Sequence, residues 1–160
     1  MTQSAHVPAP GLPYPLGRLI GATARPFGQA LLVALANRAL AEQRADGMVD
    51  FLADRVLEIT VTDLDLTWAF TYRDDRIHAV HPAGRADVSV RADSASLLLL
   101  ASRRADPDTL FFRRRLMMEG DTELGLQVKN LLDTIEPEQL PPGLGRLLEE
   151  GGRLAERVSD

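Results

Sequence analysis

Apolar residues are spaced with a helical period before residue 57, and from residue 57 to 72 they alternate with other residues along the chain. Leu57, Ile59 and Val61 alternate with polar residues, and the segment 66–72 repeats the pattern after a turn. Because successive side chains of a strand point to opposite faces, each run predicts a strand with one apolar face. The turn between the runs has hairpin length. The sequence therefore predicts a sheet whose apolar face must be covered by other elements.

Further strands and helices are expected on both sides of this hairpin. Short alternating runs predict three more strands, at residues 77–80, 87–91 and 116–119. Apolar stripes and start signals predict helices at residues 27–45, 94–101, 105–112, 122–135 and 144–158. Asp93 or Ser94 is expected to cap the second of these helices and Asp121 the fourth, and Pro107 and Asp108 are expected in the first turn of the third. The order predicts an α+β fold with a five-stranded, mostly antiparallel sheet covered by helices.

Three segments are expected along the chain. Residues 1–26 contain alternating prolines and predict an extended arm with a short helix. Residues 27–135 hold the sheet and most helices and form the main domain. Residues 136–160 read as a Pro- and Gly-containing linker followed by a C-terminal helix.

Composition excludes several classes of function. The 160 residues carry 18 basic and 23 acidic side chains, and the net charge of -5 argues against nucleic acid as the main partner. The chain has no cysteine, which excludes disulfides, thiolate metal sites and cysteine nucleophiles. The first ten residues lack the pattern of a secretory signal, and the longest apolar run, residues 30–36, is too short to cross a bilayer. A soluble or peripheral protein is therefore expected, and the absence of cysteine is compatible with the reducing cytoplasm.

No catalytic or metal-binding constellation stands out. His78 and His81 are three residues apart on an expected strand, so their side chains point to opposite faces and cannot share one ion. The serines have no nucleophile-elbow context, and the paired carboxylates fall in turns or caps, where acids are common. We therefore expect neither enzymatic activity nor a cofactor.

The stretch "DTLFFRRRLMMEGDTE", residues 108–123, places aromatic and methionine side chains directly beside three arginines. Together with the expected helices 27–45, 94–101 and 122–135, it supplies more apolar surface than one small sheet absorbs. Phe and Met are adaptable wall materials for a flexible apolar ligand. The residues alone leave two interpretations open, a filled core and a lined cavity.

The segment "ADVSVRADSASLLLLASRRADPDTLFFRRRLMMEGDTELGLQVKNLLD", residues 86–133, resembles the sterol-carrier-protein type of lipid-binding domain. The similarity extends from about residue 27 to 135, and the run 106–133 is its most specific part. Within that class, the run resembles the bacterial accessory factors of ubiquinone biosynthesis. The resemblance implies a five-stranded sheet with helices around a hydrophobic tunnel, no catalytic residues, and binding of isoprenoid or acyl lipids.

Carried onto this sequence, the resemblance implies a set of lipid-binding side chains. They are Trp68, Phe70, Leu98, Leu99, Leu110, Phe111, Phe112, Met117, Leu124, Val128 and Leu131. Met117 is expected to face inward from its strand. Arg113, Arg114 and Arg115 are either solvated or hold phospholipid headgroups at the tunnel mouth.

The narrower resemblance implies a role in oxygen-independent ubiquinone synthesis. The protein would bind ubiquinone precursors or phospholipid, work at the membrane surface, and present polyprenyl intermediates to the hydroxylating partners UbiU and UbiV. The alternative is a ligand-free scaffold subunit that organises a biosynthetic complex. The identity of the lipid and the oligomeric state stay open at this point.

Overall fold

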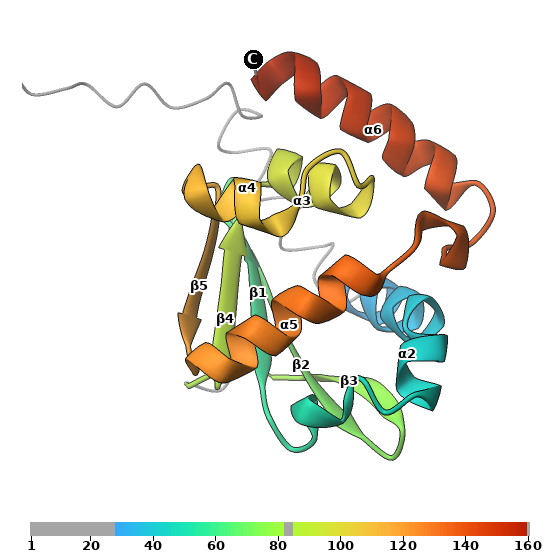
Figure 1. Ribbon diagram of the computed structural model, residues 1–160, viewed down its shortest axis with the longest axis vertical. Coiled ribbons are helices and arrows are strands. Elements are labelled where there is room, and N and C mark those ends of the chain that lie inside the picture. Colours follow the sequence, from blue (N-terminus) through green and yellow to red (C-terminus); the bar gives the residue numbers. More distant parts are fainter. Residues whose placement is uncertain (1–27, 82–84, 160) are drawn as a thin grey trace, which may run out of the picture.

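The computed structural model describes residues 28–81 and 85–159 (Figure 1). The expected arm and short helix of residues 1–26 lie outside the described residues.

Five strands form one sheet, as the alternation predicts. They are β1 (Leu57–Val61), β2 (Leu66–Arg73), β3 (Arg76–Val80), β4 (Val88–Ala92) and β5 (Leu116–Gly120). Their order is β3-β2-β1-β4-β5. The β1–β4 pair is parallel and the other three pairs are antiparallel. Hairpins join β1 to β2 and β2 to β3, whereas α3 and α4 connect β4 to β5. The predicted five-stranded, mostly antiparallel sheet is confirmed.

The register gathers the apolar residues on one face of the sheet. Ile59 of β1 lies opposite Trp68 of β2 and Val90 of β4, and Val90 lies opposite Met118 of β5. Residues in register share a face, so these side chains form one continuous apolar floor. The other face carries polar residues such as Thr60, opposite Thr67 and Arg91.

Helices cover the apolar face (Figure 1). Residues 28–39 are helical. The remaining helices are α2 (Ala41–Ala45), α3 (Ser94–Ala101), α4 (Pro107–Phe112), α5 (Thr122–Thr134) and α6 (Leu144–Ser159), with short 3-10 turns η1 (Asp50–Leu52) and η2 (Pro137–Gln139). Figure 1 shows α5 crossing the sheet, and α6 lies on the outer side of α3. The single helix expected over residues 27–45 is interrupted at Leu40, which leaves the helical backbone before α2 begins.

Aspartates start three of the helices. The side chain of Asp93 accepts a hydrogen bond from the Ser96 amide at 2.8 Å, and Asp106 accepts one from the Thr109 amide at 2.8 Å. Asp121 accepts from the Leu124 amide at 3.0 Å. Each carboxylate satisfies an amide that the first turn of a helix leaves unpaired. The predicted cap of α5 at Asp121 is confirmed, and of the two candidates for α3 the cap is Asp93. Pro107 lies in the first turn of α4 as predicted, whereas the cap of that helix, Asp106, was not predicted.

Candidate functional site

The apolar face of the sheet is not completely filled by the helices. A cavity of about 540 Å³ lies between the sheet, the 28–39 helix, α3, α5 and α6. Its apolar lining includes Leu32, Leu35, Ala36, Leu57, Ile59, Val90, Leu97, Leu100, Val128, Leu132, Ile135, Leu140, Leu144 and Leu148. The volume falls within the range of small-molecule sites, roughly 300–1,000 Å³. We call this space the main cavity.

Three charged side chains also line the main cavity: Arg103, Asp106 and Asp133. Arg103 donates hydrogen bonds to the backbone oxygens of Asp133, at 3.0 Å, and Ile135, at 2.7 Å. Hydrogen bonds from the Thr109 hydroxyl and amide hold the pKa of Asp106 below its ordinary value, so this carboxylate is charged at neutral pH. The lining of the main cavity is therefore mostly apolar and also includes a small group of charged side chains.

Helix α6 forms one side of the main cavity, and a glycine lets it approach α3 closely. Leu144 and Leu148 of α6 line the cavity. A Cβ atom at Gly152 would lie 2.9 Å from the Cβ of Ser102, which is too close for two carbons. An ion pair between Arg104 and Glu156, 2.5 Å long, joins the end of α3 to α6. Glycine is thus required at the point where α6 meets α3.

A second, smaller cavity of about 300 Å³ lies between α4, β5 and α5. Pro107 lines both cavities, and so stands between them. Beside it, Lys129 of α5 and Asp108 of α4 form an ion pair at 2.7 Å, and this hydrogen bond raises the pKa of Lys129. The two cavities are neighbours separated by the start of α4.

The residues that the resemblance implies to bind lipid differ in location: some line a cavity, some are buried, and one faces α6. Val128 lines the main cavity and Phe111 lines the smaller one. Five others are buried: Phe70, Leu99, Leu110, Leu124 and Leu131. Trp68 is half-buried and packs against the core. Leu98 lies on the opposite side of α3, where it faces Gly151 of α6. Contact of any of these residues with lipid remains a prediction.

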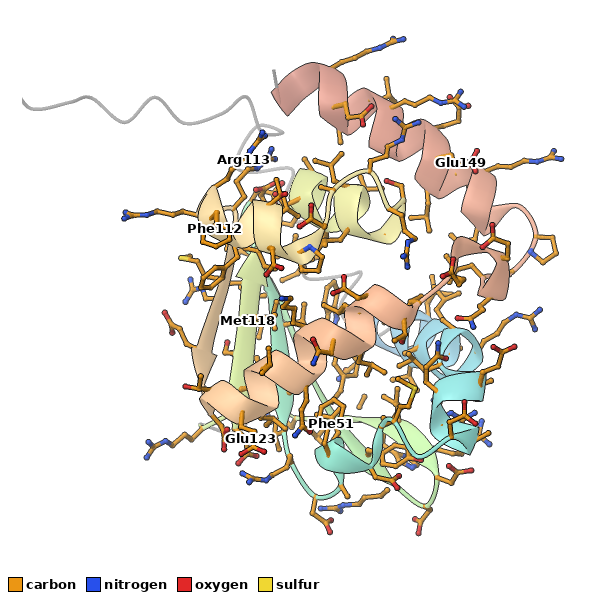
Figure 2. The ribbon with its side chains drawn as sticks, in the orientation of Figure 1. Phe51, Phe112, Arg113, Met118, Glu123 and Glu149 are labelled. Carbon is orange, nitrogen blue, oxygen red and sulfur yellow. The ribbon has the colours of Figure 1, made fainter. Side chains whose placement is uncertain are left out.

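The expected inward orientation of Met117 is wrong. Met117 pairs with Arg91 on the polar face of the sheet and is 43% exposed, whereas Met118 packs against the core. The alternation is correct, but β5 begins at Leu116, which is buried, so every second residue from there faces inward. Phe112 is 82% exposed and lines neither the main cavity nor the smaller one. Figure 2 shows Phe112 at the outer end of α4, away from Met118.

The three consecutive arginines differ in their surroundings. Arg115 is half-buried and contacts Asp93 at 3.2 Å. Burial raises the pKa of Asp93, but hydrogen bonds from Arg115 and Ser96 and the charge of Arg115 outweigh it and hold the pKa below its ordinary value. Arg113 and Arg114 are exposed. Only these two are therefore placed to meet a partner outside the chain.

Sequence reasoning missed most of the main cavity's lining. Leu32, Leu35 and Ala36 belong to a helix whose broad apolar stripe indicated cover on two sides, which was a usable signal. Leu144 and Leu148 belong to α6, whose mixed charges gave no hint of a cavity. Their contribution depends on the return of α6 over α3, which is a long-range contact.

Within residues 28–81 and 85–159, no three His, Cys, Asp or Glu side chains come together as a metal site would require. No helix in the same residues is long and apolar enough to cross a membrane.

Comparison with known proteins assigns the chain to a family. The family model "SCP-2 sterol transfer family" matches residues 34–133. The ubiquinone biosynthesis accessory factor UbiT of Escherichia coli strain K12 is 52% identical over 103 residues, which are 64% of this chain and 59% of UbiT. UbiT of Escherichia coli O157:H7 matches equally well. The chain thus spans about three fifths of the length of these relatives.

Solved structures show the same fold. A structure described as "UbiJ-SCP2 Ubiquinone synthesis protein" superposes with a TM-score of 0.59 at 23% identity, covering 69% of this chain and 97% of that one. The sterol carrier protein domain 2 of Helicoverpa armigera superposes with a TM-score of 0.50 at 13% identity, covering 62% and 83%. With a family model that matches most of the sheet and its helices, the chain belongs to the SCP-2 sterol transfer family.

Proposed function

We propose that this protein binds an isoprenoid or acyl lipid in the main cavity and presents it to other enzymes, without catalysing a reaction itself. The observation that supports this most is the cavity of about 540 Å³, whose lining is mainly Leu, Ile, Val and Ala. Such a lining binds by removing apolar surface from water, at about 25 cal/mol per Å². A lipid tail therefore supplies its own affinity and needs no reactive group.

The charged side chains of the cavity orient the proposed ligand. An apolar tail lies against Ile59, Val90 and Leu132, and the polar head stays near Arg103 and Asp106. Buried polar groups without hydrogen bonds are costly, so the reverse orientation is disfavoured.

The pathway is proposed from the UbiT relatives, whose name assigns them to ubiquinone biosynthesis. On this proposal the ligand is a polyprenyl precursor of ubiquinone, or a phospholipid, and the receiving enzymes are the hydroxylating proteins UbiU and UbiV. The protein works in the cytoplasm at the inner membrane, where lipids with such tails reside. Residues 27–135 form the lipid-binding domain in this proposal, and residues 1–26 and 136–160 flank it.

The first experiment measures uptake of lipid from solution. Ala36 lines the main cavity, whereas Ala34 of the same helix is exposed. We expect Ala36→Phe to fill part of the cavity and to weaken binding of a fluorescent fatty acid and of a short polyprenol at least tenfold. Ala34→Phe adds the same ring on the outer face and serves as the matched control. Thermal unfolding of both variants checks that they are folded.

The second experiment identifies the lipid carried from the cell. Organic extraction of the purified protein followed by mass spectrometry is expected to release an isoprenoid quinone, one of its precursors, or a phospholipid. A wild-type protein that is empty and takes up neither probe contradicts the proposal, as does an Ala36→Phe variant that binds like the wild type. A protein that binds no lipid but still assembles with UbiU and UbiV would instead support the scaffold alternative.

A further inference from the structure

The junction between α4 and β5 exposes large apolar side chains beside basic ones. Phe112 is 82% exposed, Phe111 is 51% exposed and Met117 is 43% exposed. The two phenyl rings contact each other edge to face, with centroids 6.2 Å apart. Together with Arg113 and Arg114, these residues are called the α4–β5 corner. A cluster of this kind is unusual on a monomer surface and marks sites of interaction.

The corner is basic in a chain that is acidic overall. Arg113 and Arg114 form no ion pair with any residue that the structure describes, and no acidic residue occurs in the sequence between Asp108 and Glu119. Arg91, also exposed, lies opposite Met117 in the register of β4 and β5. The net charge of the chain is -5, so the positive charge of the corner contrasts with the acidic excess of the chain as a whole.

The backbone at the corner gives a second, independent indication. The Arg114 amide donates to the oxygen of Phe111 and the Arg115 amide to the oxygen of Leu110, both at 2.9 Å, which is the Schellman ending of a helix. Arg114 occupies the left-handed position of this motif, with φ of 56°. Glycine suits that position best, because a side chain there is strained. The fold alone therefore favours glycine where the chain has arginine.

The end of α3 also has an arginine in the left-handed position, and there the side chain bonds to the protein itself. Arg103 has a φ of 54° at the equivalent position, and its side chain donates to the backbone oxygens of Asp133 and Ile135. Arg114 has no such contact with the described residues. Its side chain is available for a partner outside the chain.

We propose that the α4–β5 corner is a docking surface for an anionic lipid bilayer, with Phe112 inserted among the lipids and Arg113 and Arg114 on their phosphates. This inference rests on the proposed function, which puts the protein at the membrane, and deepens it by assigning the surface that meets the bilayer, which is distinct from the main cavity. Aromatic rings beside basic side chains are what interfacial binding to anionic lipid requires. Figure 2 shows Phe112 and Arg113 projecting from the end of α4, a shape that suits insertion into a soft surface.

Docking in this way brings the smaller cavity to the lipid surface. Phe111 belongs to the α4–β5 corner and also lines that cavity, as does Leu126, which is 54% exposed. The start of α4 at Pro107 then separates the lipid surface from the main cavity.

The test is co-sedimentation of the full chain with vesicles. We expect binding to phosphatidylcholine vesicles that contain phosphatidylglycerol, weaker binding to phosphatidylcholine alone, and loss of the difference at high salt. An arginine near an anionic surface strengthens binding about fivefold, so Arg113→Gln/Arg114→Gln should weaken it roughly 25-fold. Phe112→Ser should weaken it about tenfold, because a buried phenyl ring is lost.

The matched control removes the same charge elsewhere. Arg38 and Arg76 are exposed and form no ion pair with a described residue, so Arg38→Gln/Arg76→Gln should weaken vesicle binding by about twofold or less. If the wild-type protein does not co-sediment with anionic vesicles, the proposal is overturned, and the corner is assigned to contact with another protein instead. The same holds if the Arg113/Arg114 variant binds vesicles as the wild type does.

Arg114→Gly separates a structural role from the proposed one. Glycine relieves the strained backbone, so the melting temperature should be equal or higher while vesicle binding falls about fivefold. A lower melting temperature with unchanged vesicle binding would assign Arg114 to the fold instead. Uptake of a fatty acid from solution should be unchanged in Arg113→Gln/Arg114→Gln, so failure of docking and failure of ligand binding are measured separately.

Discussion

The contact between α6 and α3 provides the sharpest test of how the main cavity is closed. Gly151 and Gly152 are neighbours in α6, and both face α3. A Cβ at Gly151 would lie 2.9 Å from a terminal methyl of Leu98, which can rotate away. A Cβ at Gly152 would lie 2.9 Å from the Cβ of Ser102 and 2.7 Å from the Cδ of Arg104. Alanine is therefore tolerated at the first position and not at the second.

The magnitude follows from a comparison of the two variants. Replacing glycine by alanine within a helix is worth about 1 kcal/mol of helix propensity, and this gain is the same at both positions. The Ser102 side chain cannot retreat easily, because its hydroxyl donates to the oxygen of Leu98 at 2.7 Å. Overpacking of this kind costs about 1–3 kcal/mol. We expect Gly152→Ala to be less stable than Gly151→Ala by that amount.

The assay is urea or thermal denaturation of both variants, with unfolding monitored by circular dichroism. For a chain of this size, each kcal/mol corresponds to about 2–4 °C in melting temperature. In Gly152→Ala, α6 has to move away from α3, so Leu144 and Leu148 leave the main cavity and a dye that reports apolar surface should bind more strongly. Equal stability of the two variants would refute the close packing of α6 on α3, and with it the role of α6 in closing the cavity.

Two further predictions concern titrating side chains. Asp93→Ala removes the cap of α3 and the partner of Arg115, so the free energy of unfolding should fall by about 1–2 kcal/mol. The pKa of Asp93 is lowered in the folded state, so this contribution to stability is present above pH 3.8 and is lost as the pH falls through the folded pKa. Acid denaturation of the wild type and of Asp93→Ala measures this loss. The hydrogen bond from Tyr72 to Asp75 raises the pKa of Tyr72 to about 12, so its stabilisation is complete below pH 10 and is lost as the pH rises toward 12. Tyr72→Phe should cost about 1 kcal/mol at neutral pH and abolish that alkaline dependence, and a variant with the same alkaline profile as the wild type would contradict this.

The sequence alone determined the strands and the helix starts of this protein. Alternation from residue 57 to 72 and the aspartates at residues 93 and 121 act through neighbours in the chain, so their effect is visible in the sequence. The family resemblance likewise rests on a continuous segment, and it predicted the fold correctly. The orientation of β5 was harder to predict, because a shift of one residue exchanges Met117 and Met118 between the two faces.

Only the tertiary structure decided which apolar residues fill the core and which enclose a cavity. The four consecutive leucines of α3 are alike in sequence, yet Leu97 and Leu100 line the main cavity, Leu98 faces α6 and Leu99 is buried. A run without periodicity has no preferred face, so its partners are set by elements that arrive from elsewhere. Helix α6 begins more than forty residues after α3 and reaches it through Gly152, and that distant contact decides where the cavity ends.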